Sequence, residues 1–322
     1  MTKFTDLIDL AAERTGGIAL EASDDFFAEK ENLLKPGRGI FIADKYTDHG
    51  KWMDGWESRR KRTTGHDWCI IKLGLRGIIA GVDIDTNHFL GNHPPHASIE
   101  AACVIGTPTE NDWQEILIKS PLEPGSQNLY EINSESQWTH LRLHIYPDGG
   151  VARLKVYGEV KPHWSLFADK QILDLVAVEN GGRVISCNDM FFSSKDNLIM
   201  PNRGANMGDG WETKRRRGPG HDWSILKLGK AGTIKNIEID TCHFKGNYPD
   251  RCSLESIYAP DATDEDLTTM DWQAFLPEVK LSADKQHYFE QELLHHNKIS
   301  HLRFNIFPDG GISRLRINGS IN

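Results

Sequence analysis

The chain has 322 residues, and its 37 Lys and Arg against 46 Asp and Glu give a formal net charge of −9. General nucleic-acid binding needs a broadly basic surface, so this balance argues against it while leaving room for a local basic pocket. The five cysteines form no CxxC pair, and no stretch approaches the roughly 20 apolar residues of a membrane span. The acidic N-terminus has no apolar run typical of a signal peptide, so we expect a cytoplasmic protein.

An internal duplication organises the whole chain. Residues 54–68 return as residues 209–223, with Asp-Gly-Trp-Glu, two Arg and Gly-His-Asp-Trp at the same spacing. Residues 84–92 and 140–150 return in the same way as 239–247 and 301–311. A repeat of this length indicates two copies of a domain. We predict a first repeat over residues 1–165 and a second over 166–322.

The local pattern predicts strands in chain order. Short runs rich in β-branched residues, bounded by Gly, Pro or Asp, occupy residues 68–73, 77–85, 98–104 and 141–146. The turn at 147–150 predicts a hairpin with a return strand over 151–157. Trp68 and Trp223 begin strands and are predicted to pack in the core. Many short strands with turn signals favour an all-β fold, here two tandem jelly-roll β-sandwich domains.

Arginines provide the candidate substrate-binding groups. A guanidinium binds a carboxylate through two parallel hydrogen bonds and stays charged at any working pH. The basic runs 59–62 and 214–217 follow the repeated Asp-Gly-Trp-Glu segment, so we predict carboxylate binding by four of their members: Arg60, Arg62, Arg215 and Arg217. A solvated surface is the alternative. Arg38 and Arg203 lie in Pro-x-Arg-Gly loops and are candidate second anion contacts or structural pins.

Histidine beside aspartate provides the candidate acid–base groups. His66-Asp67 and His221-Asp222 precede predicted strands. The imidazole pKa lies near working pH, which suits a general acid or base. The carboxylates Glu57 and Glu212 on the preceding segments strengthen this interpretation, so all six residues are predicted catalytic candidates. Turn capping by His and Asp is the alternative.

A metal site is the weaker hypothesis. Asp85-x-x-His88 and Asp240-x-x-His243 each supply two ligands, whereas a divalent metal usually needs three or more. His93 and His96 have no histidine counterparts in the second copy. We therefore predict no metal ligand and no cofactor, and keep a divalent metal such as manganese as an alternative.

Three segments, residues 50–60, 65–74 and 85–92, make the chain resemble the allantoicase (allantoate amidinohydrolase) family. The resemblance implies two jelly-roll domains similar to galactose-binding-like modules and a homo-oligomer. It also implies hydrolysis of the small molecule allantoate to ureidoglycolate and urea in purine and allantoin degradation. This is hydrolysis at a carbon–nitrogen bond of a linear amidine. Asn92 then becomes a candidate contact for the ureido groups.

Two other functions stay open beside this one. Jelly-roll domains often bind sugars, so a non-catalytic tandem ligand-binding protein is the main alternative. A metal-dependent hydrolase of another substrate is the third.

Overall fold

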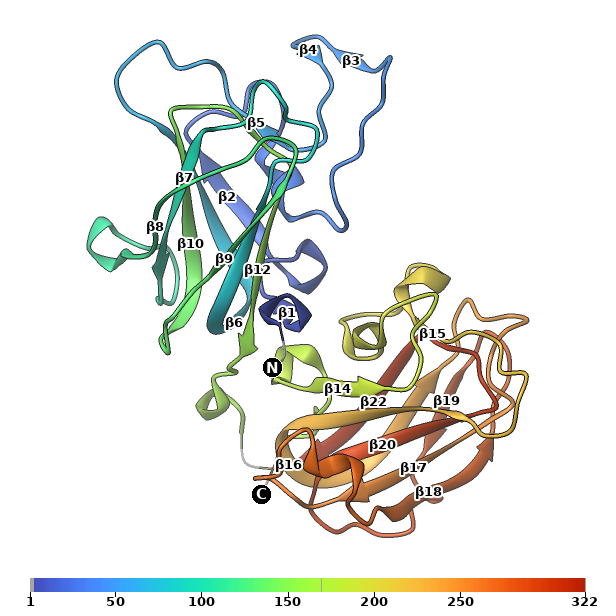
Figure 1. Ribbon diagram of the computed structural model, residues 1–322. Helices are drawn as coiled ribbons and strands as arrows, with labels where there is room; N and C mark the ends of the chain where they lie inside the picture. Colours follow the sequence, from blue (N-terminus) through green and yellow to red (C-terminus); the bar gives the residue numbers. More distant parts are fainter. Residues whose placement is uncertain (1–2, 169, 322) are drawn as a thin grey trace. The chain divides into compact units, whose positions relative to one another are not determined.

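The computed structural model describes residues 3–168 and 170–321. The chain divides into two compact units, Met1–Pro162 and His163–Asn322, coloured blue to green and yellow-green to red in Figure 1. Each unit is a jelly-roll β-sandwich, so the predicted all-β fold of two tandem duplicated domains is confirmed. Among the described residues, no helix is long and apolar enough to cross a membrane.

Over residues 3–162, the first unit is built from strands and four 3₁₀ turns. The strands are β1 (Ile8–Asp9), β2 (Ile18–Ala22), β3 (Tyr46–Thr47), β4 (Gly50–Lys51), β5 (Trp56–Glu57), β6 (Asp67–Asp85), β7 (His96–Ala102), β8 (Gln114–Pro121), β9 (Gln127–Glu131), β10 (Gln137–Tyr146), β11 (Gly150–Val151) and β12 (Arg153–Val160). The 3₁₀ turns are η1 (Phe4–Asp6), η2 (Glu13–Thr15), η3 (Lys30–Leu34) and η4 (Glu110–Asp112).

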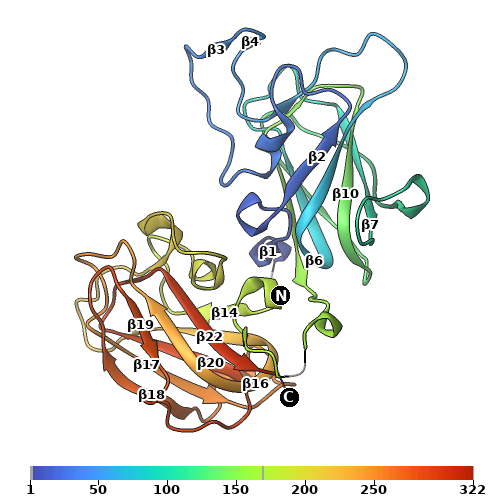
Figure 2. The same ribbon diagram turned by 180° about the vertical axis from the view of Figure 1, so that it is seen from behind.

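The long strand β6 belongs to both layers of the first sandwich. Its first part pairs with β2 and β10, and its last part pairs with β9 and β12. Sheet I therefore runs β2-β6-β10-β7-β8, and sheet II runs β1-β12-β6-β9. The turned view in Figure 2 shows β2, β6 and β10 side by side. The two predicted strands 68–73 and 77–85 are thus one continuous element.

The second unit repeats this topology. Its strands are β13 (Leu173–Asp174), β14 (Arg183–Cys187), β15 (Trp211–Glu212), β16 (Asp222–Asp240), β17 (Arg251–Ile257), β18 (Gln273–Lys280), β19 (Gln286–Phe289), β20 (Ile299–Phe307), β21 (Gly311–Ile312) and β22 (Arg314–Ser320). Its 3₁₀ turns are η5 (Trp164–Leu166), η6 (Val178–Asn180), η7 (Lys195–Ile199), η8 (Met207–Asp209) and η9 (Asp266–Thr268). Strand β16 takes the place of β6 and pairs with β14, β20, β19 and β22.

The turn at residues 147–150 does not close a hairpin, so that prediction was wrong. Strand β10 pairs with β6 and β7, whereas β12 pairs with β6 and β1. The turn instead carries the chain from sheet I to sheet II. Local turn chemistry shows where the chain reverses, but not which strand the next segment joins.

The tryptophans divide between core and surface differently from the prediction. Trp56 and Trp211 are fully buried, and each indole N–H donates to a backbone carbonyl at 2.8 Å. Trp68 is only half-buried, because strand alternation turns its neighbours Asp67 and Cys69 inward and Trp68 outward. Trp223 is half-buried in the same way. The core prediction for Trp68 and Trp223 was therefore wrong.

Candidate active site

Both ends of β6 lie at one end of the first sandwich. Its first residue, Asp67, pairs with Ile145 near the end of β10, and its last, Asp85, pairs with Arg153 at the start of β12. The short segment 146–152 alone joins β10 to β12, so the loops before and after β6 converge beside it. These loops carry the repeated sequence motifs.

The turn at residues 147–150 holds the converging loops together. Its carbonyls accept hydrogen bonds from the backbone N–H groups of Ser58 and Asp67, at 3.2 and 3.1 Å. Its last N–H, that of Gly150, donates to the carbonyl of Asn92 at 2.8 Å. The segment 58–66 and the loop after β6 are therefore anchored to one another through a single turn.

Within the basic run 59–62, Arg59 and Lys61 are held by aspartates, and the other two residues are free. Arg59 Nε donates to Asp24 Oδ2 at 2.6 Å. The N–H of Lys61 donates to Asp148 Oδ2 at 2.9 Å, and Lys61 Nζ lies 2.7 Å from Asp67 Oδ1. Arg60 and Arg62 on either side are exposed, and no described residue forms a hydrogen bond or ion pair with either side chain. Two guanidinium groups on an anchored segment are thus available to an anionic ligand.

His66 begins a chain of hydrogen bonds across the outer face of sheet I. His66 Nε2 lies 2.9 Å from His144 Nδ1, and His144 Nε2 lies 2.8 Å from Glu100 Oε2. Arg142 Nε donates to the same Glu100 oxygen at 2.7 Å. The strand register explains why the Arg142 and Glu100 side chains are in contact, since Arg142 of β10 pairs directly with Glu100 of β7. We call His66, His144 and Glu100 the first-unit relay.

The charges in the relay determine which nitrogens carry protons. Burial tends to raise the pKa of Glu100, but hydrogen bonds from His144 and Arg142 outweigh it, so the pKa is lowered and the carboxylate is ionised. An ionised carboxylate only accepts, so His144 donates from Nε2 and accepts at Nδ1. His66 then donates from Nε2, and its Nδ1 lone pair is free. No described residue is hydrogen-bonded to that nitrogen.

Both relay histidines are held in the neutral form. Burial is the largest cause that lowers the pKa of His66, followed by repulsion from His144. Burial also lowers the pKa of His144 and outweighs the opposing effect of the Glu100 carboxylate. A neutral imidazole with one free lone pair has the properties of a general base.

A tyrosine and a lysine complete the surroundings of His66. The Tyr146 ring lies against the His66 ring, with centroids 4.4 Å apart, and its hydroxyl is 2.9 Å from Ser98 Oγ. Lys119 Nζ lies 4.3 Å from the centroid of the Tyr146 ring. The imidazole is therefore held between an aromatic ring and the relay, near a positive charge.

The predicted catalytic carboxylate Asp67 has a different environment. Its side chain is 1% exposed, and Oδ1 accepts from Ser23 Oγ at 2.8 Å in addition to its contact with Lys61. No hydrogen bond joins Asp67 to His66 among the described residues. Asp67 points inward as the first residue of β6, so it anchors the loop while His144 takes the place expected of a carboxylate partner.

Glu57 and Asn92 are brought together as a pair. Asn92 Nδ2 donates to Glu57 Oε1 at 2.7 Å. Burial raises the pKa of Glu57, against the lowering effect of this hydrogen bond. A half-buried carboxyl group with a raised pKa can hold or release a proton closer to neutral pH. The backbone of Glu57 pairs with Gly150 of the anchoring turn.

The loop arginines are committed to aspartates in both units. Arg38 makes two hydrogen bonds to Asp85, at 2.7 and 2.8 Å, and Arg203 makes two to Asp240, at 2.9 and 3.1 Å. This two-point geometry agrees with the structural interpretation of these residues. The donors that a substrate carboxylate would need already have partners.

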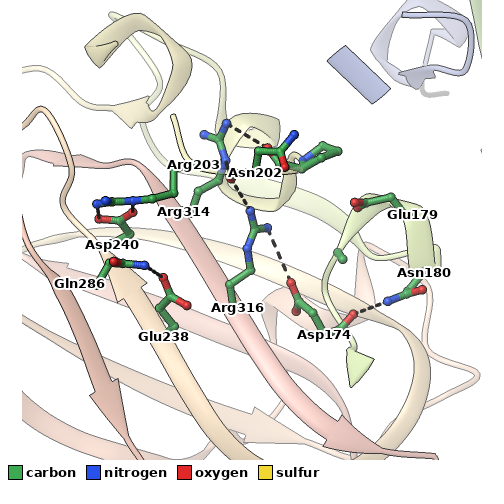
Figure 3. A pocket seen from close by; sticks show the side chains of 12 residues that line it. Asp174, Glu179, Asn180, Asn202, Arg203, Glu238, Asp240, Gln286, Arg314 and Arg316 are labelled. Atoms are coloured by element: carbon green, nitrogen blue, oxygen red, sulfur yellow. Dashed lines mark hydrogen bonds and ion pairs between the residues drawn. The ribbon is translucent and has the colours of Figure 1, made fainter. Parts of the chain in front are cut away.

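Arg203 also lines a pocket of about 610 Å³ in the second unit, shown in Figure 3. Two further arginines reach its wall, and both are paired: Arg314 with Asp209 at 2.9 Å and Arg316 with Asp174 at 3.6 Å. The pocket therefore combines paired charges rather than free cations.

The second unit keeps the plan of the relay but changes its middle member. By register, Asn305 takes the place of His144: it pairs with Trp223 and Ser253, as His144 pairs with Trp68 and Ser98. His221 Nε2 lies 3.2 Å from Asn305 Oδ1, and Asn305 Nδ2 donates to Glu255 Oε2 at 3.1 Å. The Asn305 amide accepts one hydrogen bond and donates another, but it cannot take up or release a proton near neutral pH.

The other candidates of the second unit follow the first. Asp222 is buried and pairs with Arg216, as Asp67 pairs with Lys61. Glu212 accepts a hydrogen bond from Asn247. The remaining candidates are exposed arginines with no hydrogen-bond or ion-pair partner among the described residues: Arg215 and Arg217.

The family model described as an allantoicase repeat matches residues 8–161 and again residues 173–322. The chain belongs to the allantoicase family. It is 53% identical to a probable allantoicase of Burkholderia mallei, over 98% of this chain and 95% of that protein. It is 48% identical to the allantoicase of Dictyostelium discoideum, over 98% of this chain and 88% of that one.

A solved structure gives the same assignment. The crystal structure of allantoicase from Saccharomyces cerevisiae matches with a TM-score of 0.82 and 37% identity, over 98% of this chain and 93% of that chain. The match covers both sandwiches, so the resemblance noted from the sequence motifs is confirmed.

The structure does not support a metal site at the Asp85-x-x-His88 motif. Asp85 is bound to Arg38, and His88 Nε2 lies 3.1 Å from the carbonyl oxygen of Gly39. Among residues 3–168 and 170–321, no three or more His, Cys, Asp or Glu side chains are grouped to hold a metal ion. The motif builds the loop that follows β6.

Three residues of the site were not predicted from the sequence: His144, Glu100 and Tyr146. The signal was present in part, because strand alternation places Arg142, His144 and Tyr146 on the outward face of β10. What alternation could not show is that β6 and β7 would lie on either side of β10, with His66 at one edge and Glu100 at the other.

Proposed function

We propose that this protein hydrolyses allantoate to ureidoglycolate and urea, a step in the degradation of allantoin and so of purines. The relatives named allantoicase match both repeats and nearly the whole chain, which supports this activity. The observation that carries the chemistry is the free Nδ1 of His66 at the end of the first-unit relay.

The reaction needs protein groups that bind the carboxylate, groups that bind the ureido units and a group that transfers protons. Allantoate has one carboxylate and a carbon that bears two ureido groups. Arg60 and Arg62, which have no partner among the described residues, are suited to the carboxylate. Glu57 and Asn92 offer acceptors and donors to a ureido group.

His66 is the proton-transfer group of this proposal. Water adds its oxygen to the central carbon and gives up one proton, while the carbon–nitrogen bond to urea breaks and the leaving nitrogen gains one. The two transfers balance, so a single base that accepts a proton at Nδ1 and later returns it suffices. Such general acid–base catalysis contributes on the order of 10² to 10⁴ in rate.

The direct test is incubation of the purified protein with allantoate, followed by assays of urea and ureidoglycolate. We expect equal amounts of the two products. No urea at any pH, with or without added divalent metal, would contradict the hydrolase. Calorimetric titration with neutral glycans and with small ureido carboxylates then separates a binding module from an enzyme.

Three further expectations belong to this proposal. We propose that the reaction needs no cofactor; dialysis against a chelator, with activity followed before and after adding manganese, tests the metal alternative. We also propose a homo-oligomer, which light scattering of the purified protein tests. The proposed compartment is the cytoplasm, and cell fractionation tests it.

A further inference from the structure

We infer that the first unit carries the turnover, with His144 as the positioning residue that links His66 to Glu100, and that the second unit's copy is a reduced site. This inference rests on the proposed function and deepens it. The first repeat is then the catalytic one, and His144, Glu100 and Tyr146 belong to its active site.

The first-unit relay is continuous from His66 to Glu100. When His66 takes a proton at Nδ1, the Nε2 proton is shared with His144 Nδ1, and the His144 Nε2 proton is shared with Glu100. The new positive charge is thus balanced by an ionised carboxylate two hydrogen bonds away. Proton sharing along the whole chain needs a titratable group at each step.

In the second unit the same path is interrupted. Asn305 accepts from His221 at 3.2 Å and donates to Glu255 at 3.1 Å. The amide orients His221 but cannot take its proton, because an amide neither gains nor loses a proton near neutral pH. A positive charge on His221 is therefore linked to the Glu255 carboxylate only through the dipole of the Asn305 amide.

The second unit also lacks the polar group that lies beside the imidazole in the first. Tyr146, which contacts both His66 and Ser98, has Phe307 as its register equivalent. Phe307 keeps the ring contact to His221, with centroids 4.7 Å apart, but has no hydroxyl. The shape of the site is retained while its polar function is removed.

The charge beside the site is also reversed. Lys119 lies over Tyr146 in the first unit and is one of the charges that lower the pKa of His66. The β7–β8 and β17–β18 registers place Glu278 at the position of Lys119. Glu278 is paired with Arg251 at 2.7 Å. An anionic substrate meets a cation at this position only in the first unit.

The first copy contains a segment that the second copy lacks. Between Gly39 and Asp54 the first copy is longer and forms the β3–β4 ribbon. His49 from this ribbon stacks on Phe26, with ring centroids 4.1 Å apart, and Arg59 lies over the same ring. Phe26 is 41% exposed, whereas its counterpart Phe191 is 69% exposed. The inserted ribbon and the first residue of the basic run thus pack on the same aromatic ring.

A matched pair of variants tests the inference in the full-length protein. His144→Asn gives the first unit the amide that the second unit already holds in a folded sandwich, and Asn305→Ala removes that amide. We expect His144→Asn to lower kcat for urea release by on the order of 10² with little change in KM. Asn305→Ala should keep kcat.

The pH profile provides a readout that a purely structural role would not move. Repulsion from His144 is one cause of the lowered pKa of His66. His144→Asn removes that repulsion and also the link to the Glu100 carboxylate that balances a protonated His66, so the acidic limb of kcat/KM should shift in His144→Asn and stay in place in Asn305→Ala. Thermal unfolding of each variant checks that the fold is intact.

A second pair keeps the inference testable if His144→Asn fails to fold. Glu100→Gln and Glu255→Gln preserve size and hydrogen bonding while removing the charge at the end of each path. We expect only Glu100→Gln to lower kcat. The inference is overturned if both variants of a pair lose kcat equally, or if the first-unit variant loses none. Either result leaves the proposed hydrolase activity intact. A wild-type protein that releases no urea overturns both.

Discussion

His66 shows how a partner decides what a side chain can do. Beside Asp67 in the sequence, it suggests a histidine–carboxylate pair, yet Asp67 turns into the sandwich and His144 becomes the partner. The consequence is chemical, because a second imidazole orders the tautomers and leaves Nδ1 of His66 free. The candidate base was predictable from local sequence, and its orientation was not.

Arg60 and Arg62 provide the first prediction at this scale. Replacing either by Ala removes a charged donor that no described residue uses. A charge-assisted hydrogen bond contributes about 1.5 to 3 kcal/mol, so KM for allantoate should rise roughly tenfold or more, with kcat affected less. Steady-state urea release measures this. Arg76→Ala, at the other end of the unit where β6 crosses between the sheets, is the control that should leave KM unchanged. A KM unaffected by both substitutions of the basic run would remove it from the site.

His301 on β20 gives a prediction about pH. It is fully buried, and burial lowers its pKa to about 4. In the unfolded chain its pKa is near 6.5, so below that value the unfolded state binds the proton and the folded state does not. Stability should therefore fall as pH drops from about 6.5 towards 4, by about 2 kcal/mol at pH near 5.

Urea unfolding of wild type and His301→Gln at neutral and mildly acidic pH measures this effect. The variant should lose less stability on acidification than the wild type. The exposed His163→Gln is the matched control and should lose as much as the wild type. Identical pH dependence in all three proteins would show that His301 does not contribute.

At the scale of elements, the turn at residues 147–150 is the feature on which the site depends. It links sheet I to sheet II and receives the hydrogen bonds of the loops that hold Ser58, Asp67 and Asn92. Prediction from sequence placed the turn correctly and its connection wrongly. Strand pairing is a non-local choice, and the turn residues carry no information about it.

Gly150 tests how closely this turn is packed. A Cβ at Gly150 would lie 2.0 Å from two atoms of the buried Phe89 ring. Gly150→Ala must therefore displace a core aromatic, and overpacking of this kind costs about 1 to 3 kcal/mol. Gly91→Ala, whose Cβ meets nothing within 4 Å, is the control.

The free energy of unfolding in denaturant measures both glycine variants. Gly311→Ala in the second unit should match Gly150→Ala, since its Cβ would lie 1.9 Å from Phe244. If Gly150→Ala were as stable as Gly91→Ala, the turn would be less constrained than its contacts indicate.

At the scale of the whole molecule, the duplication produced two units with separate cores. Trp56 and Phe89 are buried in the first, and Trp211 and Phe244 in the second. The strand pairings of each sandwich lie within one unit. A domain of this size can bury enough apolar surface to fold by itself.

We therefore predict that fragments 1–162 and 163–322 fold independently. Each should show a β-sheet circular dichroism spectrum and a single cooperative thermal transition. Calorimetry of the two fragments and of the full chain makes the comparison. An unfolded fragment would mean that its core depends on the other unit.

The sequence by itself determined the duplication, the positions of most strands and the family, because these depend on order and spacing along the chain. It also singled out His66, Glu57 and the basic run as groups able to do chemistry. Only the tertiary structure decided which of these groups meet. His66, Glu100 and His144 come from three separate segments, and the antiparallel register of β10 with β7 sets two of them side by side. Cross-strand neighbours are set by pairing across the sheet, which spacing along a single chain does not contain.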